Sequence, residues 1–284
     1  MRRLGEGDRP AIEAFLGARI ETSMFPLGNL ARHGMNGGHP RAMRFWGAGA
    51  PLEGVLGVTE TGMVMPQLPP RLAGEAAVAL AGERLLGILG DSGQAVALRG
   101  AMGLDEAPAD LDADEVLLAL DLAALSMPQT AGLALAPLEA APRDLLVRWR
   151  AGYGREALGW TDGARAEADV ESDIAGGQHR VLLRDGEPVA STGFNARLPG
   201  IVQVGGVWTP PENRGQGLAR AAVALHLAEA RAEGVERAIL FSASPFALRA
   251  YRALGFRDIG RFTLLLFAGP QEVRHARMAG GGEG

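Results

Sequence analysis

The alternation of apolar and polar residues divides the chain into short strands and helices. Short apolar runs, typical of strands, lie near 43–47, 52–58, 63–68, 84–89 and 115–120 in the first half. Helical spacing is found there near 7–18, 72–82 and 93–102, and a second helix begins between 21 and 30. The second half repeats this mixture, with strands near 133–138, 179–184, 188–194, 201–208, 236–241 and 261–267. Its helices are expected near 143–158, 169–175, 218–234 and 244–254, and glycines at 152 and 154 could break the first of them.

The length of the chain favours two domains. At 284 residues it exceeds the usual size of one domain, and the segment Met127–Gly132 has the composition of a linker. We therefore expect domains at 1–128 and 129–277. The Gly-rich end, 278–284, is expected to be a disordered tail.

The stretch from Ile201 to Arg220 predicts an anion-binding turn. An apolar strand is stopped by Pro210 and Pro211, since proline cannot donate to a strand ladder. Arg-Gly-Gln-Gly-Leu-Ala follows, and a helix begins at once. Glycines leave the backbone N–H groups open, and the start of a helix carries partial positive charge. The segment therefore predicts a cradle for a phosphate or pyrophosphate.

Two common phosphate-binding patterns do not fit this turn. The Walker pattern needs a lysine after its second glycine, and the chain has no lysine. The dinucleotide pattern needs Gly or Ala where Arg220 stands and an acid about 20 residues further on.

A second patterned stretch, Ser242–Phe256, predicts a short, well-delimited helix. Ser244 can cap its start, Pro245 suits the first helical position, and Gly255 suits the end. Tyr251 is one of only two tyrosines and lies on the face of this helix shared with apolar residues. Either core packing or chemistry could account for it.

Both stretches resemble motifs of the GNAT superfamily of acyl-CoA-dependent N-acyltransferases. Arg214, Gly217 and Ala219 match its motif A, Arg/Gln-x-x-Gly-x-Gly/Ala, between a strand and a helix. The second stretch is similar to motif B, with matches at Ala247, Tyr251, Gly255 and Phe256. Ser244 stands where the family often has Asn, which puts one hydrogen bond to the pantetheine arm in doubt.

The resemblance implies direct transfer of an acetyl group from acetyl-CoA, as co-substrate, to an amine. It implies that Tyr251 protonates the leaving thiolate, and that a bulge near Gly205–Thr209 exposes backbone donors to the pantetheine arm and thioester oxygen. The expected acetyl-CoA contacts are Val207, Trp208, Thr209, Arg214, Gly215, Gln216, Gly217, Leu218, Ala219, Arg220 and Ser244. It also implies a mixed, mostly antiparallel sheet flanked by helices in each domain.

The first half looks like a degenerate copy of the second. Ile88–Leu104 aligns without gaps to Leu240–Phe256, with identities at Ser92, Ala95, Ala101 and Gly103, and the order of elements before it also repeats. Arg99 replaces the tyrosine, and no Arg-x-x-Gly-x-Gly/Ala turn follows the third strand. Two unrelated α/β domains are the alternative.

The general base for the amine is not evident from the sequence. Glu156, Asp162 and Asp173 lie where the acceptor site is expected, yet each also suits a solvated surface. His179 and His226 are interpreted as structural, and a water chain could serve instead. The histidines show no metal-ligand spacing, so we expect no metal.

The composition of the chain argues against several classes of binding partner. A net charge of −5 without a basic run argues against nucleic acid or an anionic membrane, and the absence of cysteine excludes thiol nucleophiles. With no signal peptide or long apolar span, we expect a cytoplasmic protein. The acceptor could be a small amine, an amino acid or a peptide. A non-catalytic acyl-CoA-binding or sensing protein and a tRNA-using aminoacyl-transferase are the alternatives, and a homodimer stays open.

Overall fold

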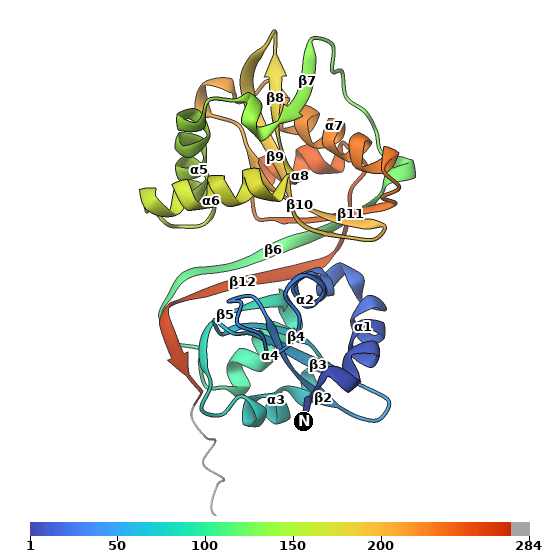
Figure 1. The fold of residues 1–284 in the computed structure, drawn as a ribbon, viewed down its shortest axis with the longest axis vertical. Coiled ribbons are helices and arrows are strands. Elements are labelled where there is room, and N and C mark those ends of the chain that lie inside the picture. Colours follow the sequence, from blue (N-terminus) through green and yellow to red (C-terminus); the bar gives the residue numbers. More distant parts are fainter. Residues whose placement is uncertain (274–284) are drawn as a thin grey trace, which may run out of the picture. The chain divides into compact units, whose positions relative to one another are not determined.

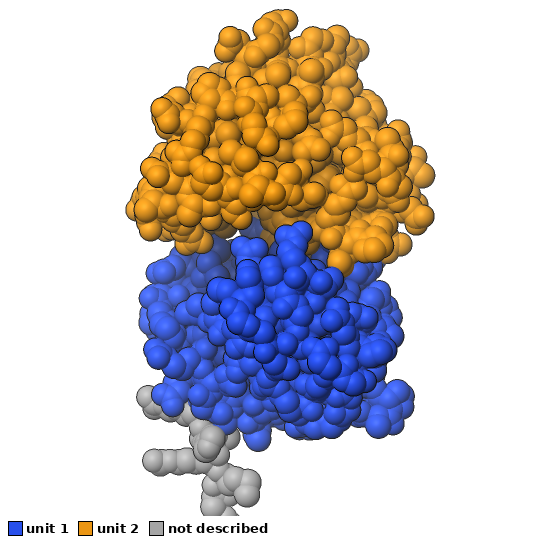
Figure 2. All heavy atoms as spheres, in the orientation of Figure 1, with its two compact units in different colours: residues 1–115, 261–284 blue, residues 116–260 orange. Residues whose placement is uncertain are grey.

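A computed structural model describes residues 1–273. The chain forms two compact units (Figure 2). Unit 1 is Met1–Glu115 together with the chain from Arg261 onward, and unit 2 is Val116–Gly260. The predicted border at 128/129 therefore differs from this division, and the predicted border at 277/278 and tail at 278–284 lie outside the described residues.

Unit 1 has one sheet with helices beside it (Figure 1). Its strands are β1 (Arg2–Leu4), β2 (Met43–Ala48), β3 (Gly54–Thr59), β4 (Met63–Gln67) and β5 (Arg84–Asp91). Its helices are α1 (Arg9–Gly17), α2 (Ile20–His33), α3 (Ala73–Ala79) and α4 (Ser92–Ala101), with short 3-10 turns η1 (Glu6–Asp8) and η2 (Pro70–Leu72). The strands lie in the order β1-β2-β3-β4-β5-β12, where β12 is Arg257–Glu272.

Unit 2 is built in the same way. Its strands are β6 (Ala109–Asp121, of which the part from Val116 belongs to this unit), β7 (Leu133–Pro137), β8 (His179–Arg184), β9 (Glu187–Leu198), β10 (Ile201–Trp208) and β11 (Arg237–Ser242). Its helices are α5 (Arg143–Ala157), α6 (Gly163–Gly176), α7 (Leu218–Ala232) and α8 (Pro245–Arg252), with 3-10 turns η3 (Leu122–Ala124), η4 (Leu138–Ala140) and η5 (Pro211–Asn213). The strands lie in the order β7-β8-β9-β10-β11-β6.

The two strand orders are the same except that the last strands are exchanged. In each unit an antiparallel run leads to one parallel pair, β4 with β5 and β10 with β11. The strand that follows α4 in the chain, β6, pairs antiparallel with β11 in unit 2. The strand that follows α8, β12, pairs antiparallel with β5 in unit 1. This exchange explains why the predicted domain borders differ from the observed units.

Each face of the sheet in unit 2 has its own core. On β8, Val181 packs with residues of α5 and α6, whereas the next residue, Leu182, packs with residues of α7. Successive strand residues point to opposite faces, so α5 and α6 cover one face and α7 covers the other. Tyr251 of α8 packs in the cluster that contains Val223 and Leu227 of α7.

Helix α5 runs without the break that its glycines suggested. A Cβ on Gly152 would lie 2.6 Å from the ring of Trp208, and one on Gly154 would lie 2.6 Å from the ring of Trp160. The two glycines therefore let indole rings pack against the helix. Helix α6 is longer than expected because Asp162 caps it, its carboxylate accepting from the N–H groups of Ala164 and Arg165.

Candidate functional site: a strand gap, a glycine turn and a histidine pocket

The turn between β10 and α7 has the conformation that its glycines predicted. Gly215 and Gly217 have φ of 76° and 75°, and Gly217 is the residue that immediately precedes α7. Nothing lies within 4 Å of a Cβ placed on Gly215, so glycine is required there by the backbone angle rather than by space. Two left-handed residues at a helix start turn successive N–H groups the same way, which is the geometry of an anion-binding nest.

Arg220 is the free cation beside this turn. Its Nε is buried and has no hydrogen-bond partner within residues 1–273, and no ion pair engages its guanidinium there. One terminal nitrogen lies 3.7 Å from the position of a Cβ on Gly217, so the side chain folds back toward the nest. Arg220 is half-buried, and a partly desolvated cation without a counter-ion is stabilised by a ligand that supplies the missing charge. This arrangement fits a phosphate group.

Arg214 is already engaged by the protein. Its guanidinium donates to the Thr209 carbonyl at 3.0 Å and to the Glu156 carboxylate at 2.9 and 3.1 Å, and it lies over the Trp208 ring. These contacts tie the turn to α5. Gln216, in the same turn, accepts from Arg184 at 2.8 Å. The phosphate roles expected of Arg214 and Gln216 stay predictions.

Strands β10 and β11 separate in front of the turn. Their parallel pairing ends at Gln203 with Ile239, although both strands continue, and Leu240–Ser242 pairs on its other side with β6. The pairing of β10 with β9 is irregular between Gly205 and Trp208, and Gly206 has φ of 61°. Among the described residues, the edge of Val204–Trp208 on the β11 side forms no strand pairing. Backbone donors are therefore open to a ligand in this gap.

The predicted contact residues after the bulge lie beside this gap. Val207 packs at the edge of the cluster that holds Tyr251. Trp208 is buried, and its indole Nε1 has no hydrogen-bond partner within residues 1–273; the same holds for the Thr209 hydroxyl. Leu218 is buried under the turn, and Ala219 is half-buried.

Tyr251 and Ser244 come from α8. Tyr251 is 8% exposed and packs edge-on to Phe256, in the same cluster as Val204 and Leu240, which flank the gap. The Ser244 hydroxyl accepts from the Ala247 N–H at 3.4 Å and caps α8, as its position predicted. The structure thus places Tyr251 beside the separated strands.

A pocket lies on the opposite face of the sheet, under α5 and α6. It has a free volume of about 40 Å³, and it reaches Gly206 in the bulge. Its polar lining includes Asp173, His179 and Ser191, and its apolar walls include aromatic rings. The rings belong to Trp149, Tyr153 and Trp208.

His179 and Asp173 were not expected to act together. The imidazole Nδ1 lies 3.5 Å from the Asp173 carboxylate. Asp173 is on α6 and His179 begins β8, and the left-handed Gly177 turns the chain back between them. Because Asp173 lies on a helix and His179 on the following strand, no single periodicity relates them, and no sequence pattern indicated the pair. The interpretations of Asp173 as a solvated charge and of His179 as structural are thus put in question.

Burial holds His179 in its neutral form. Loss of solvent, together with the positive charges of Arg150 and Arg180, lowers the pKa of His179 to about 4. Both arginines have carboxylate partners, Asp169 and Glu229. At neutral pH the imidazole therefore offers one unprotonated nitrogen as an acceptor.

His226 is buried on the other face. Its ring stacks on Phe194 with centroids 3.8 Å apart, and it is 3% exposed. Burial is the main cause that lowers the pKa of His226 to about 3, and nearby Arg180 adds to it. This environment supports the structural interpretation.

Two histidines, His179 and the buried His226, predict acid sensitivity of unit 2. Because both folded pKa values lie below that of the unfolded chain, the unfolded state binds more protons. Their contribution is complete above about pH 6.5 and declines as the pH falls toward 4. At pH 5 each histidine therefore lowers the free energy of unfolding by about 2 kcal/mol. Urea denaturation between pH 8 and pH 5 should show a loss of stability about 2 kcal/mol smaller in His226→Gln than in wild type; parallel curves would contradict the assignment.

Comparison with known proteins agrees with this geometry. A family model described as the acetyltransferase (GNAT) family matches residues 146–256. Residues 146–256 are a GNAT domain. The match includes the β10–β11 gap, the glycine turn and Tyr251. No curated protein matches the chain.

Solved structures extend the likeness to the whole chain. A GCN5-related N-acetyltransferase from Kribbella flavida is 21% identical, covers 89% of this chain and 95% of its own, and has a TM-score of 0.58. One from Sphaerobacter thermophilus is 17% identical, with coverage of 96% and 95% and a TM-score of 0.54. A tandem GNAT protein from the clavulanic acid biosynthesis pathway is 16% identical, with coverage of 95% and 98% and a TM-score of 0.54. Together with the repeated strand order, these likenesses show a tandem GNAT fold.

Unit 1 has the same fold as the GNAT domain, but it lacks the corresponding backbone N–H donors. Prolines at 66, 69 and 70 remove N–H groups from the end of β4 and the turn after it. The Leu68 N–H is taken by the Gln94 side chain at 2.7 Å. Arg99, which replaces the tyrosine of the GNAT domain, donates to Asp112 and to two backbone carbonyls. Unit 1 therefore repeats the fold, and its loss of the acetyl-CoA site stays a prediction.

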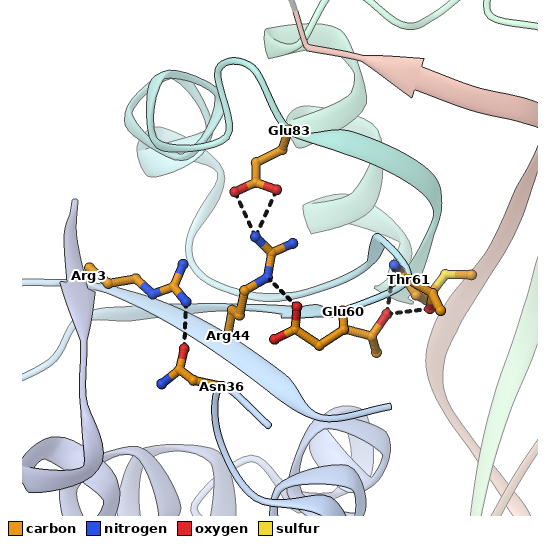
Figure 3. A network of polar contacts seen from close by, with 8 residues as sticks. Arg3, Asn36, Arg44, Glu60, Thr61 and Glu83 are labelled. Atoms are coloured by element: carbon orange, nitrogen blue, oxygen red, sulfur yellow. Dashed lines mark hydrogen bonds and ion pairs between the residues drawn. The ribbon is translucent and has the colours of Figure 1, made fainter. Parts of the chain in front are cut away.

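A polar network in unit 1 is centred on Arg44. Arg44 of β2 donates to Glu83 at 2.8 and 2.9 Å and lies 3.6 Å from Glu60, and Arg3 donates to Asn36 (Figure 3). This network ties β2 to the turn before β5. Within residues 1–273, no cluster of three or more potential metal ligands occurs, and no helix has the length and apolar character that spanning a membrane requires.

Proposed function

We propose that the GNAT domain binds acetyl-CoA and transfers its acetyl group directly to the amine of a small molecule, amino acid or peptide. The observation that carries this proposal is the alignment of an opened strand pair with a left-handed glycine turn and the uncompensated Arg220. A ligand with an elongated arm and a diphosphate at one end matches both features. Acetyl-CoA has this form and supplies an activated thioester.

The positions of the residues suggest a separate role for each group in binding and transfer. The N–H groups of Gly215–Ala219 and the Arg220 guanidinium would hold the diphosphate. The N–H groups of Val207 and Thr209 would hold the arm, and one of them would face the thioester oxygen as its charge develops. Tyr251 would donate its proton to the departing thiolate.

Calorimetry and a thiol-release assay test the proposal together. The full chain should bind acetyl-CoA with one site, and an amine panel should release CoA thiol. Binding without release by any amine would favour the alternative, an acyl-CoA-binding or sensing protein. No binding would overturn the proposal.

Tyr251→Phe isolates the proton donor. The ring keeps its packing in the core, so the melting temperature should change little. Turnover should fall roughly 100-fold because the thiolate then leaves without a proton. The dissociation constant of acetyl-CoA should change less than about threefold. An unchanged kcat would remove the catalytic role of Tyr251.

A further inference from the structure

We propose that the pocket under α5 and α6 receives the amino group of the acceptor and that His179 takes its proton. The inference rests on the proposed acetyl transfer and assigns the base that the sequence left open. The pocket opens on the bulge from the α5/α6 face, whereas Tyr251 packs on the α7/α8 face. A proton acceptor and a proton donor would thus approach the gap from opposite sides.

Two glycines make room for the imidazole. His179, Gly193 and Gly205 form a row of neighbours across β8, β9 and β10. A Cβ on Gly193 would overlap the His179 ring, so that ring lies flat over the glycine backbone. His179 Nε2 lies 3.1 Å from the position of a Cβ on Gly206. Nε2 is thereby held next to the irregular part of β10, where the thioester carbonyl would lie.

Asp173 fixes which nitrogen accepts the proton. The carboxylate lies 3.5 Å from Nδ1, a contact that favours the neutral tautomer with its hydrogen on Nδ1. Nε2 then has the free lone pair and faces the bulge. Asp173 acts through His179 and is a positioning residue; it also stabilises the imidazolium that forms in transfer.

The proton balance closes with these groups. The acceptor leaves one proton in solution and enters as a neutral amine. Its nitrogen forms a bond to the thioester carbon while the carbon–sulfur bond breaks. The nitrogen's surplus proton passes to His179 Nε2, which releases it to water, and Tyr251 protonates the sulfur and regains a proton from solvent. The products are an amide and CoA thiol.

The pocket also limits the acceptor. A free volume of about 40 Å³ holds roughly three water-sized groups, and rings of Trp149, Tyr153 and Trp208 wall it. An amino group and the two carbons that follow it account for this space, and a branch at the first carbon would add a fourth group that exceeds it. The site therefore suits primary amines that are unbranched next to nitrogen.

Substitution of His179 with a matched control tests the proposal. In His179→Gln we expect kcat with n-alkylamines to fall about 100-fold, with the dissociation constant of acetyl-CoA unchanged within twofold. His226→Gln, which alters the buried histidine of the other face, should keep kcat within about threefold. Added imidazole should restore part of the activity of His179→Gly and none to Tyr251→Phe.

Two further variants test the positioning. Gly193→Ala leaves His179 in the chain but removes the room for its ring, so kcat should fall as in His179→Gln. Asp173→Asn should lower kcat about 10-fold with little change in the KM of the amine. Branched isomers of the n-alkylamines should react at least 10-fold more slowly with wild type.

The outcomes separate the two proposals. Release of thiol by wild type that His179→Gln leaves unchanged would overturn the role of His179 and leave the transfer reaction standing. Equal loss in His179→Gln and His226→Gln, without rescue by imidazole, would mean that His179 is only structural. Equal rates for branched and linear amines would overturn the pocket assignment. No release by wild type with any amine would overturn the transfer itself.

Discussion

Gly217→Glu should weaken acetyl-CoA binding by more than 100-fold. The residue has φ of 75°, which an L side chain adopts at a cost of roughly 1–2 kcal/mol. The new carboxylate would also enter the nest where the diphosphate is expected, so like charges would repel. Both effects act on the same turn. Calorimetry with acetyl-CoA measures the loss, and circular dichroism checks that the fold is kept.

Gly200→Glu is the matched control for this prediction. Gly200 has φ of 75°, and nothing lies within 4 Å of a Cβ there. It lies between β9 and β10, at the opposite end of β10 from the nest. The control therefore has the same backbone strain and the same added charge. If both variants bind acetyl-CoA equally well, the glycine turn is not the diphosphate site.

Arg220 and Arg214 should differ within the same experiment. Arg220 is uncompensated, whereas Arg214 is paired with Glu156 and the Thr209 carbonyl. A hydrogen bond to a charged group contributes about 1.5–3 kcal/mol, so Arg220→Gln should cost about 10–100-fold in affinity. Arg214→Gln should cost less, because its guanidinium contacts protein groups. The reverse order would show that Arg214 leaves Glu156 to meet the ligand.

The glycine turn was predictable from sequence because its causes are local. A strand stop, two glycines and a helix start follow one another, and each residue's preference decides its own backbone angles. The cap at Ser244 is local in the same sense. By contrast, the His179 pocket depends on how α6 returns to β8 and on the vacant space over Gly193. No single segment carries that information.

The exchange of β6 and β12 could not be predicted from the sequence, for a different reason. Both strands contain a mostly apolar run, 116–120 in β6 and 262–267 in β12, follow a short helix and can pair antiparallel with a neighbour of the same kind. Because the two units repeat each other, the local pattern is equally compatible with pairing inside the sequence repeat or across repeats. Only the packing of particular side chains, such as Leu265 against the core of unit 1, distinguishes the two.

The exchange predicts which fragments fold. Residues 109–260 contain β6 and every other strand of unit 2, so this fragment should melt cooperatively and bind acetyl-CoA. Residues 129–277, the domain expected from sequence, lack β6. They would leave β11 unpaired on one side and lose four buried leucines from the core. These are Leu118, Leu120, Leu122 and Leu125.

The loss is large enough to decide the outcome. Burying each leucine contributes about 1.5–3 kcal/mol, so their removal costs about 6–12 kcal/mol. That equals the whole stability of an ordinary domain, about 5–15 kcal/mol. Thermal melts and calorimetry of both fragments measure the difference. A hybrid protein in which residues 105–125 follow Phe256, in place of β12, contains β6 at the position that β12 has in the chain. This hybrid should regain the cooperative melt that residues 129–277 lack. A cooperative melt of 129–277 alone would show that β6 is dispensable and that β12 can return to its own repeat.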